Sequence, residues 1–237
     1  MMLVVQNLHA GYDAFKVLRG IDFTVAKGQW VSIIGTNGAG KTTLMNTLTG
    51  ILPATEGSVF FQGIDTTHYK PFQLSKLGIS YMAEGRQIFN PMTVKDNLEL
   101  GGIAIGLSRL QIQRKLQEIY QQFPSLHRRL YQKAGTLSGG EQQLLALGRC
   151  LMSSPSFLLC DEPTLGLSPI AVSNFFQILQ NLHRQGIAVL MVEQNIELAL
   201  RFCDQAYVMN RGQITLSGTG QDLLNDPQVK QIYLGVL

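Results

Sequence analysis

The sequence has little charge, few cysteines and no long hydrophobic run. Only 15% of its 237 residues are Asp, Glu, Lys or Arg, against about a quarter in typical soluble proteins. No stretch approaches the roughly 18 consecutive apolar residues that a membrane-spanning helix needs, since residues 98–107 are short and broken by glycines. The low charge therefore indicates surfaces that contact other proteins, and not a chain that crosses a bilayer.

Basic clusters and a secretory leader are also missing. The formal net charge is +3, and Lys and Arg are scattered along the chain, which argues against a nucleic-acid partner. Residues 1–6 show no basic stretch followed by an apolar run, so we predict no secretory signal and a cytoplasmic location.

The three cysteines are an odd number without metal-like spacing, so we interpret Cys150, Cys160 and Cys203 as reduced packing residues. A chain of 237 residues corresponds to one large domain, or one domain with a sub-lobe. A domain of this size buries enough surface to be stable without disulfides.

Two kinds of apolar segment predict two kinds of β-structure. Residues 3–8 and 17–25 show mostly alternating apolar positions, which predicts an antiparallel lead-in. Residues 30–34, 157–160 and 187–192 are nearly continuous apolar runs, typical of parallel strands covered on both faces by helices. Each of these three runs precedes a polar turn and a helical pattern. The fold class is therefore α/β, with functional groups expected at the carboxyl ends of the strands.

The middle of the chain has a different character. Residues 107–123 carry a Gln-rich amphipathic pattern at helical spacing, and Pro124 is expected to end that helix. After residue 204 the chain returns to short strands and two short helices. We therefore predict a single domain over 1–237, with a nucleotide-binding core at about 1–70 and 136–237 and an inserted helical sub-lobe at about 71–135.

Residues 35–43 form the most specific motif. They follow the apolar run 30–34 directly and match G-x-x-x-x-G-K-[ST], whose glycines let backbone N–H groups wrap around phosphates. A helix from Lys41 would direct its positive end at the same point. Lys41 can reach the β- and γ-phosphates, and the Thr42 hydroxyl is placed to bind Mg²⁺. The predicted phosphate-binding residues are Gly35, Thr36, Asn37, Gly38, Ala39, Gly40, Lys41, Thr42 and Thr43.

Two carboxylates follow the second buried strand. Asp161 at the strand tip needs a cation or hydrogen bonds, which Mg²⁺ opposite Thr42 would supply. Glu162 lies one residue further and can act as the general base or orient the attacking water. The alternative for Glu162 is a role in capping or solvating the turn.

A second helix start carries adjacent glycines. Ser138 and Glu141 form a capping-box pattern, but that pattern does not explain Gly139 and Gly140. Their bare backbone N–H groups allow an anion to approach closely, so we expect Ser138, Gly139 and Gly140 to contact a phosphate. If both helix starts cannot reach one nucleotide within one chain, a head-to-tail pair would complete two sites.

The order of these motifs resembles that of ATP-binding cassette (ABC) ATPases over essentially the whole chain. The resemblance implies a P-loop fold of the ABC type, with ATP and Mg²⁺ as cofactors. It implies that Tyr12 stacks on adenine, although a tyrosine that packs locally in a turn is the alternative. It also implies that residues 138–140 contact the ATP of a partner cassette, and that residues 165–168 cross to that partner.

Two positions depart from the general family pattern. Glu84 stands where the family usually has a Gln that contacts Mg²⁺ and the attacking water, so we assign Glu84 to both the metal and the catalytic groups. Gln194 stands at the position of the switch histidine. A glutamine can still donate a hydrogen bond to a γ-phosphate oxygen, but it cannot carry a positive charge.

Residues 84–94, 166–169 and 226–235 resemble the second ATP-binding subunit (LivF type) of branched-chain or neutral amino-acid importers. The urea and short-amide importer subunit is the nearest alternative. The resemblance implies a different sister cassette in a heterodimer, with a homodimer of the isolated chain as the alternative. It further implies two membrane permease subunits and a substrate-binding protein as partners. It also implies a peripheral location on the cytoplasmic face of the membrane. An apolar patch of Met82, Ile88, Phe89, Pro91 and Met92 would receive the permease, unless these residues belong to the sub-lobe core.

Two other functions differ in class from an importer motor. A soluble ABC ATPase of DNA repair or translation usually has two cassettes, a long coiled-coil insert or basic extensions, and this sequence has none of these features. A nucleotide-binding regulatory subunit with little hydrolysis is the other alternative, suggested by Gln194.

Overall fold

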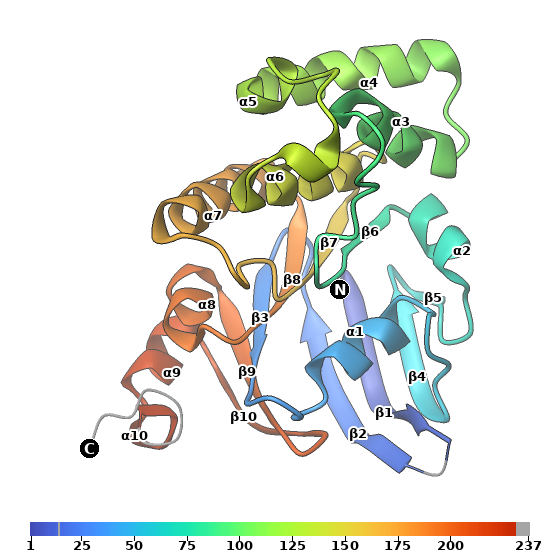
Figure 1. The fold of residues 1–237 in the computed structure, drawn as a ribbon. Coiled ribbons are helices and arrows are strands. Elements are labelled where there is room, and N and C mark those ends of the chain that lie inside the picture. Colours follow the sequence, from blue (N-terminus) through green and yellow to red (C-terminus); the bar gives the residue numbers. More distant parts are fainter. Residues whose placement is uncertain (14, 231–237) are drawn as a thin grey trace.

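A six-stranded, mainly parallel sheet forms the centre of the protein in the computed structural model, which describes residues 1–13 and 15–230 (Figure 1). Its strand order is β10-β9-β3-β8-β7-β6, and only the β9–β10 pair is antiparallel. The strands are β3 (Trp30–Ile34), β6 (Ile79–Met82), β7 (Phe157–Asp161), β8 (Ala188–Glu193), β9 (Gln205–Asn210) and β10 (Gln213–Gly218). The three predicted parallel strands are thus confirmed as neighbours.

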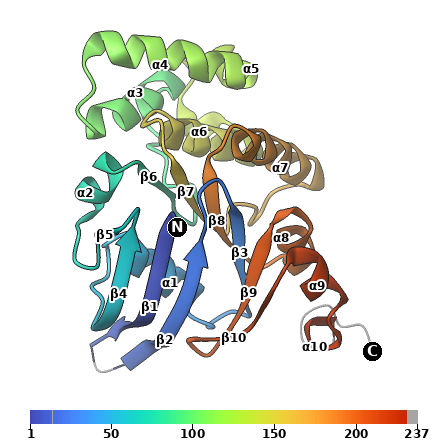
Figure 2. The same ribbon diagram turned by 180° about the vertical axis from the view of Figure 1, so that it is seen from behind.

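A second, antiparallel sheet contains the predicted lead-in. Its order is β2-β1-β4-β5, built from β1 (Leu3–Tyr12), β2 (Phe15–Val25), β4 (Glu56–Phe61) and β5 (Ile64–Asp65). In Figures 1 and 2 this sheet lies on the side of the molecule opposite α8 and α9.

Helices cover the larger sheet and build a separate layer above it (Figure 2). They are α1 (Lys41–Leu48), α2 (Pro71–Lys76), α3 (Val94–Ala104), α4 (Arg109–Gln122), α5 (Pro124–His127), the 3₁₀ turn η1 (Ala134–Thr136), α6 (Gly139–Leu151), α7 (Pro169–Arg184), α8 (Ile196–Phe202), α9 (Gly220–Asn225) and α10 (Pro227–Val229).

The larger sheet is buried on both faces because its strands alternate between two cores. In β7, Phe157 and Leu159 join the core that contains α1 and the antiparallel sheet. Leu158 and Cys160 join the other core, which contains α6, α7 and the helical layer. This two-sided burial is the physical reason for the continuous apolar runs in the sequence.

The predicted helical sub-lobe includes a strand as well as helices. Its range of 71–135 includes β6, which pairs in parallel with β7 inside the larger sheet. We therefore propose that the sub-lobe starts after β6 and comprises mainly α3, α4 and α5. The Gln-rich helix is present as α4, and Pro124 opens the next short helix, α5.

Two smaller predictions can also be compared with the structure. Cys150, Cys160 and Cys203 are free and at least partly buried, as the sequence indicated. Within residues 1–13 and 15–230, no helix is both long and apolar enough to cross a membrane. Tyr233 to Gly235, which contribute to the importer resemblance, lie outside the described residues.

A charged capping box at the start of α3 leads to a pH-dependent prediction. The Asp96 carboxylate accepts hydrogen bonds from the Thr93 hydroxyl (2.6 Å) and backbone N–H (3.1 Å), which lower the pKa of Asp96 below its usual 3.8. A lowered folded-state pKa stabilises the protein above the unfolded-state pKa, and this stability is lost as the pH falls through the folded-state value. Asp96→Ala should therefore cost about 1 kcal/mol or less at pH 7, and progressively less below pH 4.

Urea unfolding midpoints of Asp96→Ala and wild type at pH 7, 4 and 3 check this prediction. The matched control is Gln111→Ala, because Gln111 completes an uncharged capping box with Ser108 at the start of α4. Its cost should not depend on pH in this range. An equal cost of Asp96→Ala at pH 7 and pH 3 contradicts the argument.

Candidate nucleotide-binding site

Three strand ends meet at one edge of the larger sheet and bring the candidate site together. The phosphate loop follows β3, Asp161 ends β7, and Glu193 ends β8. Because these strands are parallel neighbours, their carboxyl ends lie at the same edge. The candidate residues therefore lie at the carboxyl ends of the strands, where we expect the functional groups, and their roles stay predictions.

The phosphate loop connects β3 to α1 through backbone conformations that favour glycine. Gly38 and Gly40 have φ values of 78° and 106°, in the left-handed region. A Cβ atom on Gly35 would clash with the carbonyl oxygen of Met209, whereas one on Gly38 would meet nothing within 4 Å. Gly35 thus fits tightly against β9, and the loop at Gly38 lies open on the side where a phosphate would bind.

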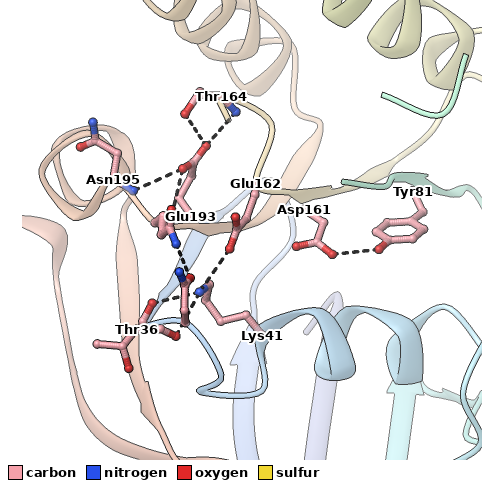
Figure 3. A network of polar contacts seen from close by, with 11 residues as sticks. Thr36, Lys41, Tyr81, Asp161, Glu162, Thr164, Glu193 and Asn195 are labelled. Atoms are coloured by element: carbon pink, nitrogen blue, oxygen red, sulfur yellow. Dashed lines mark hydrogen bonds and ion pairs between the residues drawn. The ribbon is translucent and has the colours of Figure 1, made fainter. Parts of the chain in front are cut away.

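Lys41 is the buried cation at this loop, with 5% of its surface exposed. Its Nζ lies 3.2 Å from Glu162 Oε1 and donates to the carbonyl oxygens of Gly35 at 2.9 Å and Thr36 at 3.3 Å (Figure 3). These contacts hold the ammonium group beneath the open face of the loop. A phosphate on that face would meet a cation that is already positioned.

Asp161 is a buried carboxylate with one unused oxygen. Its Oδ2 accepts a hydrogen bond from the Tyr81 hydroxyl at 3.0 Å, and its Oδ1 has no partner among the described residues. Burial raises the pKa of Asp161 to about 6; the hydrogen bond from Tyr81 opposes this rise, and the nearby negative charges of Glu162 and Glu84 add to it. Burial and the Asp161 charge raise the pKa of Tyr81, so its hydroxyl stays a donor.

These features fit a divalent cation. Asp161, Glu84, Tyr81 and Thr42 line one small pocket of about 370 Å³. A hydroxyl and carboxylate oxygens are the ligands that Mg²⁺ prefers, and a cation would satisfy Asp161 Oδ1. The predicted metal residues Thr42, Asp161 and Glu84 therefore lie around one pocket, and their role stays a prediction.

Glu162 is held in an unusual backbone conformation directly after β7. Its φ is 43°, which non-glycine residues seldom adopt, and its N–H donates to the carbonyl oxygen of Val192 at 2.9 Å. This turn redirects the chain so that the Glu162 carboxylate points at Lys41 (Figure 3).

A larger pocket lies between the phosphate loop and Glu162. Its volume of about 650 Å³ is within the usual size range of small-molecule sites. The predicted residues that line it are Asn37, Gly38, Gly40, Lys41, Thr42, Thr43, Glu84, Glu162 and Gln194. The side chain of Gln194 donates a hydrogen bond to Asn37 Oδ1. The structure therefore brings the phosphate loop, Glu84, Glu162 and the switch position around one cavity.

The signature residues lie elsewhere. Ser138 caps α6, and its capping box with Glu141 is confirmed, with Arg129 Nε 2.8 Å from the Glu141 carboxylate. Neither Ser138, Gly139 nor Gly140 is among the residues that line the 650 Å³ pocket in the described chain. The two helix starts therefore do not border the same pocket, which is the condition under which we expect a head-to-tail pair of cassettes to complete two sites.

Tyr12 is also separate from that pocket's lining. It ends β1, is 48% exposed and pairs with Phe15 across the hairpin. The apolar patch expected to receive a permease divides in two, because Met82 is buried in the core at 2% exposure whereas Phe89 is 49% exposed. Met82 therefore belongs to the core and not to a docking surface.

Sequence reasoning missed two polar residues of the site, Tyr81 and Glu193. Glu193 is 2% exposed and ends an apolar strand, just as Asp161 does. The same rule, that a buried carboxylate at a strand tip needs partners, could have identified it. No local pattern indicates that the Tyr81 hydroxyl reaches Asp161.

Known proteins resemble this chain over its full length. A branched-chain amino acid transport ATP-binding protein, BraG, from Pseudomonas aeruginosa is 41% identical, with 99% of this chain and 100% of the relative covered. A probable branched-chain amino acid transport ATP-binding protein, LivF, from Archaeoglobus fulgidus is 32% identical, with both chains fully covered. The lipopolysaccharide export ATP-binding protein LptB from Acidithiobacillus ferridurans is also 32% identical, with 99% and 97% covered.

The solved structures agree with these relatives. An ATP-binding cassette of an ABC transporter, in its ADP conformation, superposes with a TM-score of 0.87 at 34% identity and covers 99% of both chains. The predicted fold, a P-loop cassette of the ABC type, is thereby confirmed. The family model described as "ABC transporter" matches residues 18–165, which is more than half of the sequence. The chain therefore belongs to the ABC transporter family.

Proposed function

We propose that this ABC transporter ATPase powers the import of branched-chain or neutral amino acids through a membrane permease. The observation that carries the proposal is the full-length, 41% identical relative whose name assigns it to branched-chain amino acid transport. Lys41 and Glu162 line the 650 Å³ pocket and Asp161 lines the 370 Å³ pocket, and the two pockets share Thr42 and Glu84, which supports hydrolysis at this chain's own site.

The residues of the pocket divide the work of phosphoryl transfer. The N–H groups of the phosphate loop and the start of α1 bind the β- and γ-phosphates, and Lys41 adds its charge. Thr42 and Asp161, with Glu84 beside them, would hold Mg²⁺. When bound, Mg²⁺ neutralises the negative charge that develops on the phosphates.

Glu162 and Gln194 act at the γ-phosphate. In the structure Glu162 is paired with Lys41, and a bound γ-phosphate would compete for that ammonium group. Glu162 is then free to orient the attacking water and accept its proton. Gln194 would donate a hydrogen bond to a γ-phosphate oxygen instead of to Asn37.

Two observations support the partners in this proposal: the signature residues lie away from the 650 Å³ pocket, and a full-length relative is named as a transport protein. The signature residues at the start of α6 would close over the ATP of a sister cassette, with Tyr12 stacked on this chain's own adenine. Two permease subunits and a substrate-binding protein would complete the importer. The subunit would then lie on the cytoplasmic face of the membrane.

Replacing Lys41 tests nucleotide binding directly. Lys41→Met removes the buried cation, and the loss of charged hydrogen bonds should weaken ATP binding by roughly tenfold to a hundredfold. Fluorescence titration of the purified chain with the ATP analogue TNP-ATP, with Mg²⁺ present, measures the change. Lys27→Met is the matched control, because Lys27 is exposed in the turn before β3. Equal affinities of Lys41→Met and wild type would argue against this site.

Uptake measurements test the transported class. A strain without this chain should lose uptake of labelled leucine, and wild type should restore it where Glu162→Gln does not. Uptake of urea and export of lipopolysaccharide, measured in the same strains, separate the two alternatives. Normal leucine uptake with defective urea uptake would replace the amino-acid assignment by the urea one, and defective lipopolysaccharide export would favour an LptB-like role.

A further inference from the structure

One buried carboxylate, Glu193, contacts both loops that border the proposed γ-phosphate site. It is the last residue of β8 and is 2% exposed. The residues before it in the strand are apolar and lie in the sheet core, so the chain brings a charge to the end of a buried strand. Such a charge is costly unless several donors satisfy it.

The first oxygen of Glu193 holds the loop that follows Glu162. Oε1 accepts the backbone N–H of Thr164 at 3.0 Å and the Thr164 hydroxyl at 2.7 Å. Thr164 lies two residues after Glu162 and is 9% exposed. This pair of bonds therefore attaches the turn that carries Glu162 to the end of β8.

The second oxygen holds the loop that carries the switch position. Oε2 accepts the backbone N–H of Gln194 at 3.0 Å and of Asn195 at 3.4 Å. All four contacts of the carboxylate are with N–H or O–H donors, which suits an acceptor-only, ionised group. The Gln194 side chain continues this network by donating a hydrogen bond to Asn37 in the phosphate loop.

We propose that Glu193 is a positioning residue that couples the loop expected to meet the partner cassette, residues 164–168, to the switch position at Gln194. Glu193 itself is not among the described residues that line the 650 Å³ pocket. When residues 165–168 move on contact with the partner, the bonds through Thr164 carry that movement to the backbone of Gln194. The inference rests on the proposed function, because it assigns a role in hydrolysis.

A surface groove beside the Glu193 hydrogen bonds supports this coupling role. Glu162, residues 164–167 and Pro169 line a groove of about 780 Å³ together with α7 and α8. Both Glu193 and Gln194 also lie in its lining. Leu165 in the same loop is 51% exposed. The loop thus has one end exposed where a second cassette would contact it and the other end bonded to Glu193.

The test uses two sites of substitution in the transporter complex purified through a tag on this chain. Glu193→Gln replaces acceptor lone pairs by an NH₂ group that faces backbone N–H donors. Thr164→Val removes only the hydroxyl bond, and Thr164→Ser keeps it. We expect Glu193→Gln to lower kcat for ATP tenfold or more and Thr164→Val to lower it several-fold, whereas Thr164→Ser stays close to wild type. KM for ATP should change less than about threefold.

Two further measurements distinguish a positioning role of Glu193 from a general loss of structure at the site. TNP-ATP affinity of the purified chain should stay near the wild-type value in all three variants. If Glu193 acts through Gln194, combining Glu193→Gln with Gln194→Ala should lower kcat no more than the stronger single variant does. Glu197→Gln, on the exposed face of α8, is the matched control and should leave kcat unchanged.

The inference would be overturned if kcat were unchanged in Glu193→Gln or Thr164→Val. It would also be overturned if TNP-ATP affinity fell in parallel with kcat. ATP hydrolysis by the wild-type complex distinguishes a failure of the coupling role from a failure of the proposed function. If wild type hydrolyses ATP while the variants match it, the coupling role fails and the proposed function stands. If the wild-type complex does not hydrolyse ATP, the proposed function itself fails.

Discussion

Glu162→Gln should lower ATP turnover by about 10²–10⁴-fold, the usual contribution of a general base, with little change in ATP affinity. The amide keeps the size of the side chain and can still accept a hydrogen bond, but it cannot take a proton from water. It also loses the ion pair with Lys41, whose Nζ lies 3.2 Å from Glu162 Oε1. A free Lys41 remains available to the phosphates, so binding should not weaken.

Single-turnover hydrolysis by the purified complex, together with TNP-ATP titration, measures both quantities. Glu118→Gln is the matched control, because Glu118 lies on the exposed surface of α4 with 63% of its side chain accessible. If Glu162→Gln left turnover unchanged, this chain's own site would not be the motor. The regulatory-subunit alternative, suggested by Gln194, would then describe the chain better.

Trp30→Ala should destabilise the fold by about 3–5 kcal/mol, the usual cost of removing a buried Trp side chain. Trp30 is fully buried in β3. Its ring stacks on Phe176 and Phe202 at centroid distances of 6.1 Å and 6.3 Å and meets the edge of His183 at 5.9 Å. The substitution would leave a cavity between β3, α7 and α8, directly beneath the strand that carries the phosphate loop.

Thermal unfolding of the purified chain measures this cost, which corresponds to roughly 6–20 °C in Tm for a chain of this size. Trp30→Phe is the conservative comparison. It keeps an aromatic ring against Phe176 and removes the indole N–H, which is buried without a partner among the described residues, so it should cost less than half as much. Equal losses in the two variants would contradict an explanation by cavity formation.

The sequence predicted correctly those features that depend on residues close together along the chain. The phosphate loop depends on a short run of glycines before a helix start, and the predicted start at Lys41 is the observed one. The buried strands depend on continuous apolar runs, since both faces of the larger sheet are covered. The cap at Ser138 depends on residues three positions apart, and its capping box forms as predicted.

Other features depend on contacts between distant segments. β6 is only four residues long, and the sequence around it reads as part of the helical insertion, so its place in the sheet comes from pairing with β7. Met82 looked like a surface residue beside Phe89, but that same pairing buries it. The bond from Tyr81 to Asp161 spans 80 residues of chain, and no spacing rule indicates it.

By itself, then, the sequence determined the α/β class, the phosphate loop, the two carboxylates at the end of β7 and the resemblance to ABC ATPases. Each depends on neighbours along the chain. Only the tertiary structure decided which groups face one another: Lys41 with Glu162, Tyr81 with Asp161, and Glu193 with Thr164. The physical reason is that parallel strands distant in sequence end at one edge, so their buried charges find partners only after the sheet has formed.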